Sequence, residues 1–345
     1  MRRLAILQTV YKGILLLALV AGSVSCKKYL PDNRDSLGDE VNYAIKEFTP
    51  ILGVKTVYEN ITTVGSNTSQ PLHYSIVNAR RYNGEEATEL LERYPVKVWT
   101  QEYTGLETSL EQIDQKRKIE YRPTLEIGRN NGNITFWDSG NASIVKTLPD
   151  SGYLFDVQVE NLGGRRFIRN MRLKPYKEMP YAPSIYNPVT GVALNSYVYP
   201  SYTLNLYGKQ NPISNVRIYF NRDEENETPG NTLSFSFVDS LNNPIDPMLF
   251  NETNWDHLIH GFDRELKDNK MVYKVAYPMP LITKPTRYTT PDGQRANVVF
   301  RYARIGYGGF RQESEIGLNF GIFQEGHWEI QIRFAGETPM FADQD

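Results

Sequence analysis

The sequence predicts an all-β protein made of tandem β-sandwich domains of the immunoglobulin-like kind, with a few short helices. Three observations support this fold class. Most segments after Val41 alternate apolar and polar residues, turn-forming residues interrupt them at short intervals, and helical periodicity is confined to a few short stretches. Alternation with a period of two and frequent turns are typical of antiparallel sheets.

The first segment, residues 1–25, has the layout of a secretory signal peptide. Arg2, Arg3 and Lys12 supply positive charge, and the apolar run GILLLALV follows at residues 13–20. Because this run is too short to span a bilayer as a helix, we expect the segment to be removed on export.

Residues 26–40 begin with Cys26, the single cysteine of the chain, which follows a run of mostly small residues. This position resembles the lipidation site of bacterial lipoproteins, and the sequence CKKYL resembles the mature start of Bacteroidota lipoproteins, although Ser23 stands where an aliphatic residue is usual. The resemblance implies a lipid on Cys26 that anchors the protein in the outer membrane, since two or more acyl chains give a stable anchor. The alternative is an ordinary signal peptide and an incidental free thiol.

The remainder of residues 26–40 is polar and is expected to form a flexible tether between the lipid and the first domain. Everything after Cys26 is expected to be water-soluble. The sequence does not indicate whether the protein faces the periplasm or the cell surface.

The composition limits the classes of partner. Lys and Arg number 38 and Asp and Glu number 40, and this balance does not predict nucleic-acid binding. The chain also contains 23 tyrosines against 15 phenylalanines and 4 tryptophans. Tyrosine combines an apolar ring with a polar hydroxyl, which suits a partly hydrated binding face.

Residues 41–149 are expected to form the first sandwich. Two short helices are expected within it, at residues 85–94 and 109–118, and Ser109 is positioned to cap the second. Asn131-Gly132 predicts a tight turn between two strands. The expected strands cover residues 73–82, 96–103, 121–128 and 133–138.

Residues 150–345 are expected to form a second, larger β-rich domain, because a turn-rich cluster at residues 148–152 marks a boundary. A Pro- and Tyr-rich segment at residues 175–202 cannot be helical. The one plausible helix covers residues 251–266. The expected strands cover residues 153–161, 216–221, 232–239, 272–279, 296–307, 315–323 and 327–336.

Several stretches of the body carry a family resemblance. They are PLHYSIVNARRYNG, YPVKVWTQEYTG, KRKIEYRPTLEI, NWDHLIHGF, VAYPMPL and RYARIGYGGFR. They resemble the Bacteroidota lipoprotein family known as domain of unknown function 5007, over nearly the whole mature chain. The resemblance implies a cell-envelope lipoprotein, often encoded near outer-membrane uptake systems of the starch-utilisation type. It implies no established activity.

The aromatic residues supply the candidates for ligand binding. Sugar rings present apolar C–H faces that can stack on aromatic rings, and a phenol can add a hydrogen bond. The alternative is that these rings pack an irregular segment between sheets. The candidate ligand-binding residues are Tyr176, Tyr181, Tyr186, Tyr197, Tyr199, Tyr202 and Trp255.

No sequence motif predicts catalysis or a metal site. The GxSxG motif that carries the serine nucleophile of α/β-hydrolases does not occur. No sequence feature singles out two acidic residues as the catalytic pair of a glycosidase. His257 and His260 lack the further ligands that zinc requires, and the turn at residues 239–246 lacks the spacing of a calcium loop. The glycines of residues 304–311 favour a hairpin over a phosphate cradle. No catalytic residue, metal or cofactor is expected.

These observations together favour an outer-membrane lipoprotein that acts as a non-catalytic accessory. It would bind a glycan or another nutrient, or associate with an outer-membrane transporter. A structural or adhesive, fimbria-like surface protein is the alternative, and a glycan hydrolase is the third hypothesis, since the fold alone does not decide function. Exposed tyrosines around a groove, an open sheet edge and two converging carboxylates are the respective signatures.

Overall fold

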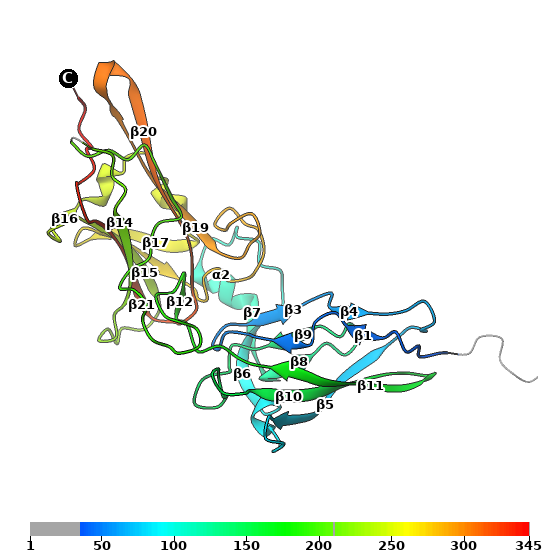
Figure 1. Cartoon of the computed structure of the whole chain (residues 1–345). Helices are drawn as coiled ribbons and strands as arrows, with labels where there is room; N and C mark the ends of the chain where they lie inside the picture. The colour runs from blue at the N-terminus through cyan, green and yellow to red at the C-terminus, as the bar shows by residue number, and fades with distance from the viewer. Residues whose placement is uncertain (1–34, 210, 345) are drawn as a thin grey trace, which may run out of the picture.

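The computed structural model describes residues 35–344 with the exception of residue 210. Cys26, the signal peptide and most of the tether lie outside the described residues. The described chain forms two lobes made mainly of strands and loops, which confirms the all-β class (Figure 1). No helix within residues 35–344 is long and apolar enough to cross a membrane.

The first lobe is built on a four-stranded sheet in the order β2-β11-β10-β5, to which a three-stranded sheet, β3-β9-β8, and the pair β1-β4 are added. All neighbours are antiparallel except β2 and β11. The strands are β1 (Asn42–Tyr43), β2 (Glu47–Phe48), β3 (Thr56–Tyr58), β4 (Thr62–Thr63), β5 (His73–Arg81), β8 (Leu125–Ile127), β9 (Ile134–Phe136), β10 (Tyr153–Asn161) and β11 (Gly164–Leu173).

The core of the first lobe is aromatic. The Phe48 ring lies 4.9 Å from the ring of Tyr58 and 6.0 Å from that of Phe155. Phe48, Phe136 and Phe155 are fully buried, and burying a side chain of this size stabilises the fold by about 1.5–3 kcal/mol. Side chains from all three sheets contribute to this one core, so they form a single folded unit.

The domain boundary differs from the expected one. β10 pairs with β5, and the buried residues Tyr153, Phe155 and Met171 belong to the core of the first lobe. The turn cluster at residues 148–152 is therefore a connection within this lobe, and a division at residue 149 would cut through its sheet. The strand pairing places the boundary between β11 and β12 instead, because no sheet of the described residues contains strands from both sides of it.

An arm formed by residues 93–123 stands between the lobes (Figure 1). It consists of β6 (Arg93–Trp99), α2 (Leu110–Gln115) and β7 (Arg117–Pro123), with β6 antiparallel to β7. The Ser109 hydroxyl accepts a hydrogen bond from the Gln112 backbone N–H over 3.3 Å, which confirms the expected cap of this helix.

The expected helix at residues 85–94 is wrong. Only a single 3₁₀ turn forms, at Thr88–Leu90, and β6 begins at Arg93. Pro95 disfavours a helical backbone at the residue before it, Tyr94, so the chain is extended there.

The second lobe contains two sheets. One has the order β14-β21-β15-β18-β17, with β16 beside β15, and the other has β20 between β19 on one side and β12 and β13 on the other. The strands are β12 (Tyr181–Ala182), β13 (Tyr202–Leu204), β14 (Val216–Arg222), β15 (Thr232–Val238), β16 (Pro244–Ile245), β17 (Gly261–Lys267), β18 (Lys270–Val275), β19 (Ala296–Ile305), β20 (Arg311–Ile322) and β21 (His327–Phe334).

The core of the second lobe lies between these two sheets. Phe237 stacks on Phe250 with ring centroids 4.1 Å apart, and Phe300 of the other sheet meets Phe237 edge-on at 5.0 Å. All three rings are fully buried. The two lobes therefore each have their own aromatic core.

The expected helix at residues 251–266 is also wrong. Trp255–His257 form one 3₁₀ turn, and β17 starts at Gly261 and pairs with β18. A side chain at Gly261 would lie 2.8 Å from Cβ of Tyr273, so the close approach of these two strands requires glycine.

Two predicted turns are confirmed. β8 and β9 form a hairpin around Gly132, and β19 and β20 form one at residues 306–310. Gly132, Gly308 and Gly309 have φ values of 68°, 81° and 76°, which glycine adopts without strain.

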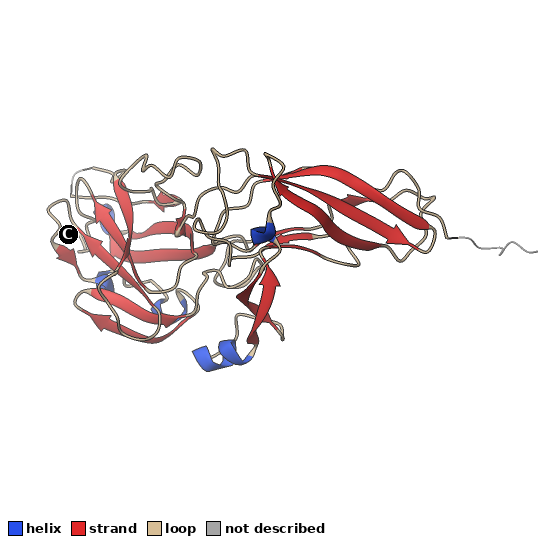
Figure 2. Cartoon of the chain, turned by 90° about the horizontal axis from the view of Figure 1, so that it is seen from below, coloured by secondary structure: helices blue, strands red, loops and turns tan. Residues whose placement is uncertain are grey.

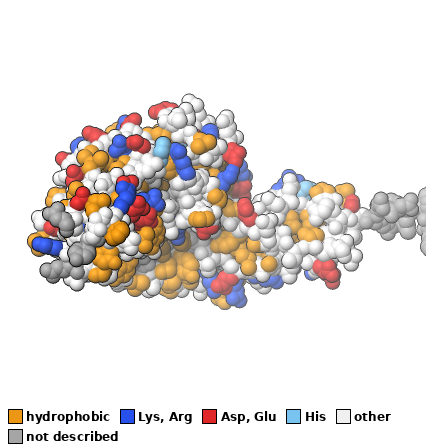
Figure 3. Space-filling model, turned by 90° about the horizontal axis from the view of Figure 1, so that it is seen from above, with side chains coloured by type: hydrophobic (Ala, Val, Ile, Leu, Met, Phe, Trp, Pro, Cys, Tyr) orange, Lys and Arg blue, Asp and Glu red, His pale blue; other side chains and the backbone are white. Residues whose placement is uncertain are grey.

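The lobes are arranged end to end, with the first described residues at the tip of the first lobe and the C-terminus in the second (Figure 2). Acidic and basic side chains are interspersed over the face shown in Figure 3. A small cluster joins arm and second lobe, in which Trp99, Tyr103 and Ile113 pack with Ala276 and Leu281. The arm thus ties the two lobes together.

Candidate binding cavity

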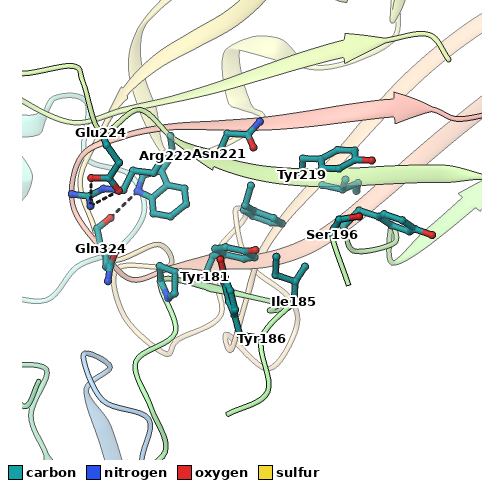
Figure 4. Close-up of a pocket in the computed structure, with 14 residues that line it drawn as sticks. Tyr181, Ile185, Tyr186, Ser196, Tyr219, Asn221, Arg222, Glu224 and Gln324 are labelled. Carbon is teal, nitrogen blue, oxygen red and sulfur yellow. Dashed lines mark hydrogen bonds and ion pairs between the residues drawn. The ribbon is translucent and has the colours of Figure 1, made fainter. Parts of the chain in front are cut away.

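A cavity of about 380 Å³ lies on the second lobe between residues 180–197, strand β14 and the start of β21. We call it the binding cavity. Figure 4 shows Arg222, Glu224 and Gln324 gathered at one end and Tyr219 and Ser196 near the other.

Strand pairing and a small hairpin hold the tyrosines of residues 180–197 in place. Tyr181 is fixed because β12 pairs with β20. Tyr186 lies at the start of the hairpin, where its backbone N–H donates to the Ser184 hydroxyl over 3.1 Å. The Asn187 carboxamide oxygen accepts from Val189 and Thr190 and closes the turn.

Three aromatic rings form the floor of the binding cavity. Tyr181 stacks on Phe220 with ring centroids 4.5 Å apart and planes 8° from parallel. Tyr181 also meets Trp328 in a T-shaped contact, with ring centroids 6.0 Å apart. Burial, with a smaller contribution from Tyr186, raises the pKa of Tyr181 to about 12. Its phenol therefore stays protonated and uncharged at neutral pH.

A second aromatic group lies at the end of the cavity near Tyr219 and Ser196. Tyr197 meets Tyr219 at 6.1 Å and Tyr199 at 5.4 Å, and the Arg217 guanidinium lies 4.5 Å above the Tyr197 ring. The hydroxyls of Tyr197 and Tyr199 are 3.4 Å apart, and this hydrogen bond raises the pKa of Tyr199.

The other end is polar. Arg222 Nη1 lies 3.0 Å from each carboxylate oxygen of Glu224, and its Nη2 donates to the Glu325 carbonyl over 3.0 Å. The Trp328 indole N–H donates to the Gln324 carbonyl over 3.0 Å. The charges at this end are paired with one another, which suits an uncharged polar ligand.

The candidate residues from the sequence separate into two groups. Tyr181, Tyr186 and Tyr197 line the binding cavity, and Tyr199 contacts Tyr197 beside it. Tyr176 lies in the first lobe, where its backbone bonds to Pro50 and Leu52. Tyr202 lies on β13 and its hydroxyl donates to Glu315 over 3.0 Å. These last two residues are not part of the cavity lining.

The assignment of Trp255 as a ligand-binding residue is wrong. Its side chain is only 6% exposed and packs in the core of the second lobe against Phe237 and Phe300. Trp255 begins a single 3₁₀ turn and belongs to the buried cluster that forms the core of the second lobe.

Sequence reasoning missed part of the lining. Tyr219, Phe220 and Arg222 lie on β14, and Trp328 lies on β21. Alternation along β14 does contain a signal, because Val216 and Ile218 are buried and Tyr219 therefore points to the other face. The packing of Tyr181 on Phe220, which brings residues near 180 beside β14, cannot be read from local sequence.

The two clustered histidines do not converge on one ligand. His260 Nε2–H donates to the Glu107 carbonyl over 2.8 Å, and its Nδ1 accepts from the Tyr103 hydroxyl. His257 is exposed and lies 3.2 Å from Arg287. Within the described residues no group of three or more His, Cys, Asp or Glu side chains is placed to hold a metal ion.

The sequence matches one family. The model of the family described as domain of unknown function (DUF5007) matches residues 63–343, so the chain belongs to this family. No curated protein and no solved structure gives a significant match.

Proposed function

We propose that this member of the family is a non-catalytic, lipid-anchored protein of the outer membrane that binds a neutral glycan in the binding cavity. The lipid anchor on Cys26 is proposed from the sequence. The ligand class is proposed from the cavity.

The observation that carries this proposal is the combination of aromatic rings and paired polar groups around one cavity. Tyr186, Tyr197 and Tyr219 offer partly exposed rings, and Arg222, Glu224 and Gln324 offer donors and acceptors at one end. Ligand sites generally combine an apolar wall with a few polar groups that fix orientation. A sugar presents C–H faces to the rings and hydroxyls to the polar end.

The size of the cavity limits how much ligand it can hold. A volume of about 380 Å³ is near the lower end of the range for small-molecule sites. It suits a short segment of a saccharide chain, with the rest of the chain outside.

The cavity offers less support for a glycan hydrolase. Hydrolysis by the common mechanisms needs two carboxyl groups about 5–10 Å apart. Among the described residues, Glu224 is the carboxylate that lines the cavity, and it is held by Arg222. A hydrolytic role at this cavity would need a second carboxylate from elsewhere.

One observation favours the alternative of a structural or adhesive protein. All three residues of β13, Tyr202–Leu204, are exposed, and among the described strands β13 pairs only with β20. An open edge of this kind can accept a strand from another chain. Concentration-dependent self-association of the purified protein would support this alternative.

The experiment that tests the proposal is a binding screen by titration calorimetry against α- and β-glucans, xylan, mannan and arabinan. It uses the chain from Asp32 onward, which contains every described element. A variant with Tyr186→Ala and Tyr197→Ala is compared with Tyr82→Ala, a matched control because Tyr82 is 57% exposed in the first lobe.

We expect saturable binding of at least one polymer by the wild-type protein and the control. The cavity variant should lose at least tenfold in affinity while its circular dichroism spectrum is unchanged. Absence of binding to every polymer, or equal binding by all three proteins, would refute a glycan site in this cavity.

A further inference from the structure

The arm presents one of its two faces to the second lobe. In an antiparallel pair, residues directly opposite each other lie on the same face. The residues of this arm face are the opposite pairs Trp99 and Arg117, Lys97 and Ile119, and Pro95 and Tyr121. The Arg117 guanidinium donates to the Tyr277 carbonyl over 3.3 Å, and Trp99 packs against the small cluster that contains Ala276 of the second lobe. The arm face therefore begins in contact with the second lobe.

Lys97 brings the arm face to the rim of the binding cavity. Its ammonium group forms an ion pair with Glu325. Glu325 directly follows Gln324 of the cavity lining, and its carbonyl accepts the hydrogen bond from Arg222. The polar end of the binding cavity and the arm face thus meet at Glu325.

Beyond Lys97 the arm face carries two large exposed side chains. Ile119 is 66% exposed and Tyr121 is 64% exposed. Neither belongs to a hydrophobic cluster formed by the described residues. Ile119 lies opposite Lys97, and Tyr121 lies opposite Pro95. Along the arm face, Ile119 therefore comes first and Tyr121 next as the distance from the second lobe increases.

We propose that the arm face is a second subsite for the same glycan, with the Tyr121 ring as the stacking platform. This proposal rests on the proposed function of the binding cavity. A saccharide chain that leaves the cavity past Gln324 meets the Lys97–Glu325 ion pair and then the Tyr121 ring.

The charges along this path favour a neutral saccharide. Arg222 pairs with Glu224 and Lys97 pairs with Glu325, so each positive group faces a carboxylate. Hydroxyl groups can donate to the carboxylates and accept from the cations, whereas an acidic sugar would be repelled by the carboxylates.

The test compares ligand length. Titrations with the disaccharide and the hexasaccharide of each polymer class in the screen (maltose and cellobiose for the glucans, and the oligomers of xylan, mannan and arabinan) are made on the wild-type protein, on Tyr121→Ala and on the control Tyr82→Ala. We expect the wild-type protein and the control to bind the hexasaccharide of one series about tenfold more tightly than its disaccharide, the effect of one good aromatic stack. Tyr121→Ala should reduce this ratio to near one, with no change in melting temperature.

The outcomes separate the two proposals. If both lengths bind with equal affinity, or if Tyr121→Ala keeps the preference for the hexasaccharide, the second subsite is refuted and the cavity proposal stands. If neither length of any series binds to the wild-type protein, the glycan site in the cavity is refuted and the subsite with it.

Discussion

Tyr181 and Tyr186 belong to the same Pro- and Tyr-rich segment and line the same cavity, but their environments differ. Tyr181 is 5% exposed and lies between Phe220 and Trp328, whereas Tyr186 is 37% exposed at the rim. Packing on neighbouring rings makes Tyr181 part of the folded core. Exposure leaves the Tyr186 ring free to contact a ligand.

This difference predicts opposite effects of truncation. Tyr181→Ala should lower the free energy of unfolding by about 3–5 kcal/mol, because it removes a buried ring and leaves a cavity. Tyr186→Ala should change it by less than about 0.5 kcal/mol, as is usual for exposed sites. Urea denaturation of both variants measures these values, and a similar loss in both would contradict the assigned roles.

Among the elements, the arm is held by a buried hydrogen-bond chain. His260 must carry its proton on Nε2, because the Glu107 carbonyl can only accept, and its Nδ1 then accepts from the Tyr103 hydroxyl. The His260 ring also stacks on Tyr288 at 4.9 Å. Lys116 completes the group through an ion pair with Glu107.

Two groups that hold the arm, the His260 imidazole and the Glu107 carboxyl, titrate in different pH ranges. Burial lowers the pKa of His260 below its ordinary 6.5. Burial by itself would raise the pKa of Glu107, but hydrogen bonds from Lys116 and Thr104 outweigh it and lower the pKa to about 2. Both groups therefore favour folding in their deprotonated form.

The attachment of the arm should accordingly weaken in acid. Stabilisation by neutral His260 is complete above pH 6.5 and is lost as the pH falls from there through the pKa of the folded state. The contribution of Glu107 is lost only between its ordinary 4.5 and about 2. Unfolding measured in steps between pH 7.5 and 5 therefore isolates His260.

The variant His260→Gln should lack this component of the pH dependence, and His257→Gln, at an exposed histidine of the same segment, should retain it. Other groups around His260 are Arg287 and the rings of Tyr103, Phe262 and Tyr288. An identical pH dependence in the wild-type protein and in His260→Gln would contradict the role given to this residue.

Most of the long strands could be predicted from sequence, including β5, which carries an extra residue opposite β10 near Asn78. Two others, β11 and β17, could not. β5, β10, β14, β15 and β21 lie close to their expected ranges. β11 was missed because its buried residues Ile168, Met171 and Leu173 change spacing at a bulge around Asn170. β17 was taken for a helix because it is an edge strand with little buried surface and a bulge of its own.

The site was predictable only in part. Tyr181, Tyr186 and Tyr197 could be proposed from sequence because they lie in the Pro- and Tyr-rich segment. This segment predicts a loop, and aromatic residues of a loop can stack on a sugar. Phe220 and Trp328 could not be found in this way. Their strands read as ordinary core strands, and only tertiary packing brings them beside Tyr181.

For the whole molecule, the positions of the two ends are consistent with a membrane-anchored binding protein. The first described residues lie at the tip of the first lobe, and the binding cavity lies on the second lobe (Figure 2). A lipid at Cys26 would hold the tip of the first lobe near the membrane, because the few residues between Cys26 and Asp35 span at most about 3.6 Å each. The cavity would then lie on the lobe farther from the bilayer.

The anchor itself is tested by Cys26→Ser. The wild-type protein expressed in a Bacteroidota host should fractionate with the outer membrane and incorporate labelled palmitate, because acyl chains would be attached to Cys26. The variant should do neither. Membrane association that survives the substitution would contradict a lipid anchor at this residue.

The central claim is that the binding cavity takes up a sugar against its exposed aromatic rings. The measurement that tests it most directly is nuclear magnetic resonance of ring-labelled tyrosine, with an oligosaccharide of the polymer that binds. The account predicts saturable shifts of the Tyr186, Tyr197 and Tyr219 signals while the Tyr82 signal stays unchanged. Saturable binding that moves none of the cavity signals would contradict it.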